Sequence, residues 1–258
     1  MQSATRQISL TGLEGFPLVV PGDDLAEIIA AALDSMRIVL QDGDILVVSQ
    51  KIVSKAENRY RNLSGVIPSE AAQEFAQILD KDARHIEVIL DESSEVLRRA
   101  DNALITVHRL GFVMANAGVD QSNIDQGDGA GMVLLLPKDP DAAASALKAA
   151  LDERYGVACG VIINDSFGRP WRKGVVGVAL GAAGVPSLRD LAGKPDLFGR
   201  PLRITEHAAA DEIASAASLI MGQAAEGMPV VHIRGLYLDG EPSPAGALIR
   251  PKIQDVFR

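Results

Sequence analysis

The order of the apolar runs constrains the fold of this 258-residue chain more than any single motif does. Short apolar runs typical of strands are interspersed with longer patterns typical of amphipathic helices. Between residues 104 and 136, however, three strand-like runs follow one another with no helical pattern between them, so the regular strand–helix alternation of a doubly wound parallel sheet is not sustained. The sequence therefore predicts an α+β fold with mixed sheets and packed helices.

The expected elements occupy most of the chain. Strands are expected at Ile45–Val48, Leu104–Val107, Phe112–Ala115, Val133–Leu136, Gly160–Ile163, Val175–Leu180 and Val230–Arg234, and helices at Asp24–Ser35, Ser69–Leu79, Ala83–Leu90, Ala142–Arg154 and Ala209–Met221. This length suits one large domain or two subdomains that share a core. We expect a single domain over residues 1–258, made of one unit or of two interleaved α+β subdomains, with an irregular tail over residues 241–258.

Charge and cysteine content narrow the function classes. The chain has 34 acidic and 25 basic side chains, a formal charge of −9, which argues against a nucleic-acid partner or an anionic membrane surface because both favour positive charge. No apolar stretch approaches the ~18 residues of a membrane span, and the N-terminus lacks the apolar core of a signal peptide. The single cysteine, Cys159, excludes a disulfide within the chain and indicates a reducing, cytoplasmic location. Its apolar surroundings in the sequence predict a buried structural thiol.

The segment Val161–Gly174 holds the first candidate site. A buried strand is expected to end at Asp165 and Ser166, followed by a glycine-containing turn with three cations, Arg169, Arg172 and Lys173. Carboxylate and hydroxyl oxygens suit hard cations such as Mg²⁺ or Mn²⁺, and the cations suit a phosphate-rich anion. A surface turn with a local ion pair explains the segment equally well. Trp171 is expected to be a packing residue rather than a stacking platform.

The segment Asn116–Asn123 has the same arrangement as the first candidate site: an expected strand is followed by a loop that carries a carboxylate. It offers Asp120, Ser122 and Asn123 in a turn that Gly118 can relax. Small polar side chains of this kind often only cap turns. If the segment is instead functional, its loop and that of Asp165 converge on one metal ion.

Two lysines follow the strand expected at Ile45–Val48. Lys51 and Lys55 are four residues apart and would share one face of a helix, where they could neutralise phosphates. A solvated basic face is the commoner explanation of such spacing.

The glycine-rich segments and the histidines match no common nucleotide-binding or metal-binding motif. The glycines of Gly174–Gly184 match neither a dinucleotide fingerprint nor a phosphate-binding P-loop, so any nucleotide is bound by another scheme. The segment Met221–Pro229 offers Gln223 and Glu226 as oxygen ligands, although Glu226 is expected to be solvated. The four histidines lack metal-binding spacing.

Taken together and in this order, these segments resemble the coenzyme F420-0:L-glutamate ligase family, in its stand-alone form without a C-terminal reductase domain. The resemblance covers Gly12 to Leu236. It rests on Gly12–Val19, Val47–Glu57, Asn116–Asn123, Leu135–Ala144, Val161–Gly184, Asp196–Leu202, Ala210–Gly222 and Val230–Leu236.

The resemblance implies a GTP-dependent ligase that joins L-glutamate to coenzyme F420-0 by an amide and extends a γ-linked glutamate tail, releasing GDP and phosphate. It implies two Mg²⁺ or Mn²⁺ ions, help from K⁺, and an intertwined homodimer with an α+β fold peculiar to the family. An acyl phosphate makes chemical sense here, because a free carboxylate has no adequate leaving group for attack by an amine.

The resemblance also assigns residues. Asp120 and Asp165 become the catalytic metal-binding aspartates, with Ser166 and Gln223 as ligands of the second metal. The nucleotide is implied to contact Phe16, Pro17, Leu18, Val19, Gln50, Lys51, Lys55, Asn123, Met221, Gly222, Gln223, Ala224, Ala225, Glu226, Gly227 and Met228. Lys51, Lys55 and either Arg169 or Arg172 are expected to bind anionic groups. Asn58 replaces a glycine that is frequent in the family, and asparagine tolerates the left-handed conformation.

Three other functions remain open. One is a metal-dependent phosphotransferase or phosphatase that uses the same aspartates without glutamate. Another is a non-catalytic nucleotide- or cofactor-binding module, which the pair of aspartates with two lysines argues against. An NAD-linked oxidoreductase ranks last, because the dinucleotide fingerprint is missing.

Overall fold

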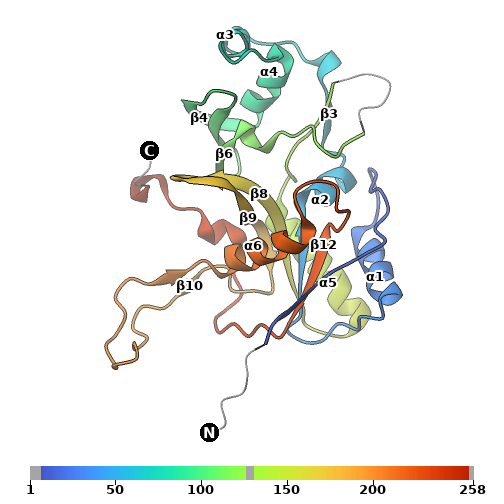
Figure 1. Cartoon of the computed structure of the whole chain (residues 1–258), viewed down its shortest axis with the longest axis vertical. Coiled ribbons are helices and arrows are strands. Elements are labelled where there is room, and N and C mark those ends of the chain that lie inside the picture. Colours follow the sequence, from blue (N-terminus) through green and yellow to red (C-terminus); the bar gives the residue numbers. More distant parts are fainter. Residues whose placement is uncertain (1–6, 126–130, 256–258) are drawn as a thin grey trace.

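A five-stranded mixed sheet forms the centre of the protein (Figure 1). The computed structural model describes residues 7–125 and 131–255. The strands lie in the order β1 (Ser9–Gly12), β12 (Val230–Arg234), β2 (Ile45–Ser49), β8 (Gly160–Arg169) and β9 (Arg172–Ala183). Only β2 and β8 run parallel, and the other neighbours are antiparallel. The predicted mixed α+β fold is confirmed.

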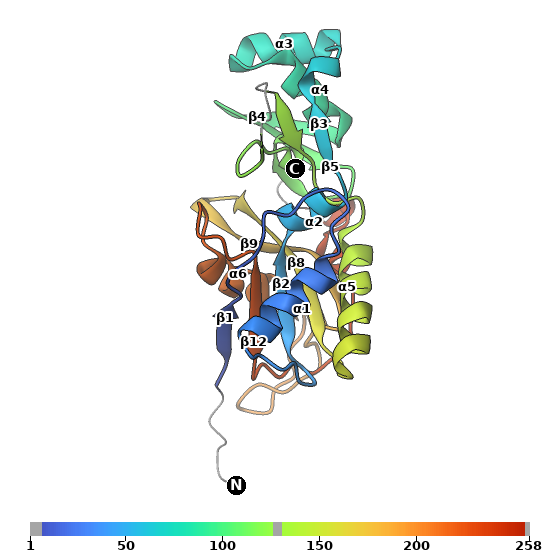
Figure 2. The ribbon, with the colours of Figure 1, turned by 90° about the vertical axis from the view of Figure 1, so that its right-hand side faces the viewer.

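Helices cover both faces of this sheet. The helices α1 (Leu25–Ser35), α2 (Gln50–Ala56) and α5 (Pro140–Tyr155) lie on one face, and α6 (Ala209–Met221) lies on the other. Figure 2 shows α1 and α5 on the same side of the strands. Because side chains alternate along a strand, Leu46 and Val48 pack towards α1 and α5, while Ile45 and Val47 pack towards α6.

The helix boundaries follow the expected capping signals. The side chain of Asp24 accepts hydrogen bonds from the backbone N–H groups of Ala26 and Glu27 at the start of α1. The predicted N-cap, Ser69, accepts one from Ala72 at the start of α3 (Glu70–Leu79). Asn58, just past α2, has a φ of 54°, the left-handed conformation that asparagine tolerates.

Residues between α2 and α5 form a separate layer with its own apolar core (Figure 1, top). It contains β3 (Tyr60–Asn62), α3 (Glu70–Leu79), α4 (Ala83–Asp91), β4 (Ser93–Arg99), β5 (Leu104–His108), β6 (Val113–Ala115) and β7 (Met132–Leu134). Strands β4, β5 and β6 make an antiparallel sheet, and β3 pairs with β7. Consecutive strands without intervening helices were predicted for this region.

Two segments lie outside these layers. The pair β10 (Arg189–Asp190) and β11 (Glu206–His207) begins an arm that extends from the body at the lower left of Figure 1. After β12 the chain makes two 3₁₀ turns, Ala245–Leu248 and Lys252–Gln254, and the buried Ala245 joins the core beside α6. None of the helices in residues 7–125 and 131–255 is long and apolar enough to cross a membrane.

A buried carboxylate closes the end of the sheet where β2 begins. Asp44 is 2% exposed and accepts hydrogen bonds from His232 Nε2 (2.9 Å), Arg234 Nε (2.9 Å) and Arg234 Nη2 (2.6 Å). Burial alone would raise the pKa of Asp44, but the Arg234 and His232 hydrogen bonds outweigh it and hold the pKa below its usual value.

The structure corrects two expectations for the segment after residue 160. The strand does not end at Asp165 and Ser166, because β8 continues to Arg169 and turns directly into β9. Backbone pairing with β9 keeps this stretch extended beyond the buried part. Trp171 was expected to pack, yet its side chain is 85% exposed at the tip of this hairpin. Cys159, by contrast, is buried as predicted, and burial raises the pKa of its thiol to about 12.

Candidate active site

The candidate site lies at the end of the main sheet where β2 stops. The last residue pair between β2 and β8 is Ser49 with Asn164. From Asp165 onwards β8 therefore runs past its parallel neighbour, and α2 begins at Gln50 beside it. Polar side chains can reach this open edge without breaking the sheet.

Asp120 reaches this edge from the other layer. It follows β6 and the turn Asn116–Gly118, and its backbone is fixed by two hydrogen bonds with Leu134, at 3.0 and 2.8 Å. Lys51 Nζ lies 2.6 Å from Asp120 Oδ2 and 2.7 Å from Ser122 Oγ. The predicted strand–loop motif thus becomes a contact between the two layers of the molecule.

The two aspartates differ in protonation behaviour. Burial would raise the pKa of Asp120, but the Lys51 ammonium and two hydrogen bonds from Ser122 outweigh it and lower the pKa. Burial raises the pKa of Asp165 from 3.8 to about 6, helped by the negative charge of Asp120 and only partly opposed by the Ser166 N–H, Lys51 and Gln50. The hydrogen bonds and the Lys51 charge around Asp165 therefore do not offset its burial.

The charges of Asp120 and Lys51 both act on the pKa of Asp165, so the structure brings the two aspartates near each other. That they share a metal ion stays a prediction. Gln50 contributes an unexpected part of this geometry. It is 3% exposed, its Oε1 accepts a 3.0 Å hydrogen bond from Ser54 Oγ, and its side chain hydrogen-bonds Asp165. The family resemblance had assigned Gln50 to the nucleotide, but its hydrogen bond to Asp165 was not predicted.

Ser166 lies on the opposite face of β8 from Asp165, because successive strand residues alternate. Its Oγ donates to Gln223 Oε1 at 2.8 Å, and Gln223 Nε2 donates to Ser218 Oγ at 2.8 Å. The proposed ligands of a second metal are therefore in contact with each other. Ser218, on α6, was not identified from the sequence.

Asn123 connects the Met221–Met228 segment with helix α2. Its Nδ2 donates to the carbonyl of Ala224 at 2.8 Å, and its own carbonyl accepts from Lys55 Nζ at 2.7 Å. Burial and the neighbouring Lys51 lower the pKa of Lys55. Lys51 and Lys55 share one face of α2, as predicted, and both bind the loop that carries Asp120.

The segment Met221–Met228 closes the same end of the sheet before β12. Gly222 has a φ of 74°, and a Cβ there would meet the carboxylate of Glu226, which also accepts a 2.8 Å hydrogen bond from the N–H of Ala224. Glu226 is exposed, as expected. Ala225 and Gly227 are exposed as well, and Met228 lies against Gly12 at the end of β1.

The turn Phe16–Val19 follows β1 at this end of the sheet. Val19 is buried and Phe16 packs against the core below α1, whereas Pro17 and Leu18 are exposed. The remaining predicted residues, Arg169, Arg172 and Lys173, lie farther out on the β8–β9 hairpin. Arg169 is four strand residues from Asp165, about 13 Å along the chain.

The donor set fits a hard divalent cation. The described residues contain no group of three or more His, Cys, Asp and Glu side chains placed for a metal. The site instead offers two sets of oxygen donors on opposite faces of β8, the carboxylates of Asp120 and Asp165 on one and the Ser166 hydroxyl with the Gln223 amide oxygen on the other. Both sets are of the type that suits Mg²⁺ or Mn²⁺. Burial raises the pKa of Asp165, and a bound cation beside this carboxylate would lower it again.

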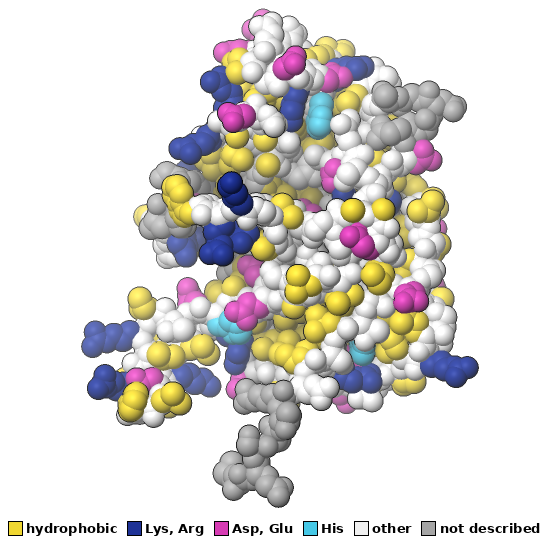
Figure 3. All heavy atoms as spheres, in the orientation of Figure 1, with side chains coloured by type: hydrophobic (Ala, Val, Ile, Leu, Met, Phe, Trp, Pro, Cys, Tyr) yellow, Lys and Arg dark blue, Asp and Glu magenta, His cyan; other side chains and the backbone are white. Residues whose placement is uncertain are grey.

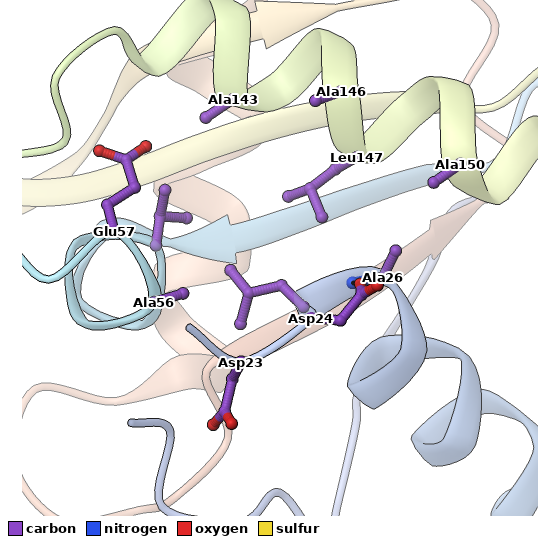
Figure 4. A pocket seen from close by; sticks show the side chains of 11 residues that line it. Asp23, Asp24, Ala26, Ala56, Glu57, Ala143, Ala146, Leu147 and Ala150 are labelled. Carbon is purple, nitrogen blue, oxygen red and sulfur yellow. Dashed lines mark hydrogen bonds between the residues drawn. The ribbon is translucent and has the colours of Figure 1, made fainter. Parts of the chain in front are cut away.

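A separate groove of about 320 Å³ lies between the start of α1, the end of α2 and α5 (Figure 4). Three carboxylates and the alanine face of α5 line it, namely Asp23, Asp24, Glu57, Ala143, Ala146 and Ala150. Asp24 is already engaged in capping α1. The groove offers no cation for an anionic ligand, unlike the site around Lys51.

Comparison with known proteins identifies the family of this chain. The sequence model described as F420-0:Gamma-glutamyl ligase matches residues 15–235, which include every residue assigned above. The chain belongs to the F420-0:gamma-glutamyl ligase family. It is therefore a ligase that forms an amide bond.

Relatives in this ligase family match over nearly the whole chain. A protein of Methanothermobacter thermautotrophicus named Coenzyme F420:L-glutamate ligase is 47% identical, over 97% of this chain and 99% of its own length. Proteins of the same name from Methanopyrus kandleri (47% identical, 95% and 97% covered) and Methanocaldococcus jannaschii (43% identical, 98% of both) are similar. The resemblance inferred from the sequence motifs is confirmed.

Proposed function

We propose that this chain joins L-glutamate to coenzyme F420-0 through an amide and consumes GTP in doing so. The observation that carries the proposal is the convergence of Asp120, Asp165 and Lys51 at the open end of β2, within the part of the chain that matches the ligase family. Two carboxylates beside two lysines suit a reaction between a nucleotide and a carboxylate substrate.

The reaction requires that the acceptor carboxylate be activated first. Its oxygen attacks the γ-phosphate, GDP leaves, and an acyl phosphate results. The amine of glutamate then attacks the acyl carbon, phosphate leaves, and the amine loses a proton as the amide forms. Orientation of the two substrates supplies much of the acceleration in a reaction of this kind.

The residues divide these tasks. Mg²⁺ or Mn²⁺, held when bound by Asp120, Asp165, Ser166 and Gln223, would supply positive charge that neutralises the β- and γ-phosphates. Lys51 and Lys55 add cationic side chains on the same side, and their bonds to Ser122 and Asn123 hold them in place. We assign the nucleotide to the space between the Phe16–Val19 turn, α2 and the Met221–Met228 segment.

Further parts of the proposal follow the family resemblance. We include extension of a γ-linked glutamate tail, stimulation by K⁺, a cytoplasmic location and an intertwined homodimer. The arm after β10 supports the dimer, because Leu197, Phe198 and Ile204 are at least 87% exposed on it. Sedimentation of the wild type and of a Phe198→Asp variant tests this part; a monomeric wild type would remove it.

The decisive experiment is a product analysis with F420-0, GTP and L-glutamate, resolved by the number of glutamates added. Omitting each co-substrate in turn serves as the control, and ATP in place of GTP tests nucleotide choice. We expect one glutamyl product per GDP released, and no turnover without glutamate. Rapid GDP release in the absence of glutamate, with no mass added to F420-0, would instead indicate a phosphotransferase or phosphatase.

A further inference from the structure

The tip of the β8–β9 hairpin exposes the only tryptophan of the chain. Arg169 pairs with Arg172, so Pro170 and Trp171 form a two-residue turn. Trp171 has a φ of 64°, in the left-handed region where glycine or asparagine is usual and a bulky residue is strained. With 85% of its surface exposed, this side chain gains little from burial in the free protein. A glycine would form the turn more easily, so the turn chemistry does not explain the tryptophan.

Positive charge surrounds this exposed ring. Three cations, Arg169, Arg172 and Lys173, stand within two residues of Trp171, in a chain with a net charge of −9. Figure 3 shows Lys and Arg side chains gathered around the end of this hairpin. The root of the same hairpin carries Asp165, so the tip lies about 13 Å along the strand from the candidate metal site. An exposed aromatic ring flanked by cations is the arrangement that binds flat, anionic aromatic ligands by stacking.

We infer that Trp171, with Arg169, Arg172 and Lys173, forms the subsite for the flat aromatic ring and the phosphodiester of the acceptor substrate. This inference rests on the proposed function and makes it more specific. The acceptor has its reacting carboxylate at one end, a phosphodiester beside it, and a tricyclic ring at the other end of a flexible polyol chain. With the carboxylate at Asp165, the chain extends along β8, the phosphodiester meets the cations and the ring stacks on Trp171.

Guanine of GTP is also a flat ring, so the geometry must distinguish the two. Lys51 and Lys55 lie on α2, across the open edge of β8, and their bonds to the Asp120 loop hold them there, on the side that we assign to the phosphates of GTP. The hairpin tip extends away from α2 beyond Asp165. The acceptor ring and the guanine therefore occupy opposite sides of the aspartates.

The test is a Trp171→Ala variant, assayed for the affinity of F420-0 through the polarisation of the ligand's own fluorescence. A lost stacking contact should weaken binding about tenfold, within the range for a base on an aromatic side chain. The KM for F420-0 should rise by a similar factor, while the KM for GTP stays constant. Trp171→Tyr should restore most of the affinity, and Tyr237→Ala, which removes an aromatic ring that is 91% exposed elsewhere, should change nothing.

The outcomes separate this inference from the proposed function. Unchanged F420-0 affinity in Trp171→Ala, in an enzyme that still adds glutamate, overturns the subsite and leaves the ligase standing. A raised KM for GTP instead would assign the tip to guanine and also overturn it. If the wild type adds no glutamate, binding of F420-0 still decides the inference, since a tenfold loss on Trp171→Ala supports the subsite independently of turnover. Correct folding of each variant is checked by its thermal unfolding.

Discussion

Two carboxylates, the buried Asp44 and the partly buried Asp165, lie near the opposite ends of β2 and differ in their surroundings. Asp44, before the strand, is surrounded by His232, Arg234 and the Gln41 N–H, and its pKa lies below the usual value. Asp165, beyond the other end, has a pKa raised to about 6, because burial and Asp120 outweigh its few partners. A carboxylate whose partners outweigh its burial stabilises the fold, whereas one whose partners do not outweigh it is a candidate functional group.

The largest expected effect is on activity, at Asp165. Asp165→Asn should reduce glutamate addition about a thousandfold, equivalent to about 4 kcal/mol of transition-state stabilisation. The midpoint of thermal unfolding should stay constant or rise, because the variant removes a carboxylate whose raised pKa reports destabilisation by burial. The measurements are single-turnover product formation and thermal unfolding. Near wild-type activity would contradict the metal assignment.

The next effect is on stability, at Asp44. Asp44→Ala should lower the free energy of unfolding by about 3 kcal/mol, because it leaves Arg234 and the buried His232 without their carboxylate. The folded fraction should keep the wild-type kcat, since Asp44 lies at the far end of the strand. Urea unfolding measures the first expectation and active-site titration the second. A variant that stays stable but loses activity would contradict the assignment of Asp44 to stability and of Asp165 to activity.

The contrast between the two ends was only partly predictable from the sequence. The strands β2, β8 and β12 and most helices follow from apolar patterns. Asp120 was predicted as a carboxylate in a loop after a strand, whereas the expected strand end at Asp165 was wrong, since β8 continues to Arg169. What brings them together, however, is Lys51 and the bridge between Asp120 and Leu134, which join two different layers. Contacts between residues so far apart in the sequence leave no local pattern from which they could be predicted.

Other features were missed because local signals conflict with the structure. Strand β4 is polar and lies at a sheet edge, so its sequence lacks strand alternation. The strands predicted for the β8–β9 hairpin were too short. Pro170 and Trp171 are not the residues that a two-residue hairpin turn normally requires, so the turn was not recognised. Trp171 was misassigned for the same reason, since a large apolar residue is expected to be buried unless the turn that exposes it is recognised.

The pH dependence of stability should also follow Asp44. Its pKa is lower in the folded than in the unfolded protein, so the stabilisation is complete above the ordinary value of 3.8 and is lost as the pH falls through the lowered pKa. The free energy of unfolding should therefore fall less steeply below about pH 4 in Asp44→Asn than in the wild type. Urea unfolding from neutral to acidic pH measures both slopes. The contributions of the other carboxylates are the same in both proteins and cancel when the two slopes are subtracted. Equal slopes would show that Asp44 does not carry this stabilisation.

The smallest expected effect is on metal affinity, when a negative charge is added near Asp165. Gln223→Glu keeps an acceptor for Ser166, and the hydroxyl of Ser218 can rotate to donate in place of the lost amide. The added negative charge should lower the Mg²⁺ or Mn²⁺ concentration for half-maximal activity by up to about tenfold, or about 1.4 kcal/mol. Gln73→Glu on α3 adds the same charge far from the site and is the matched control. If both variants keep the wild-type metal dependence, Gln223 is not a ligand, and its bond to Ser166 serves only to tie β8 to α6.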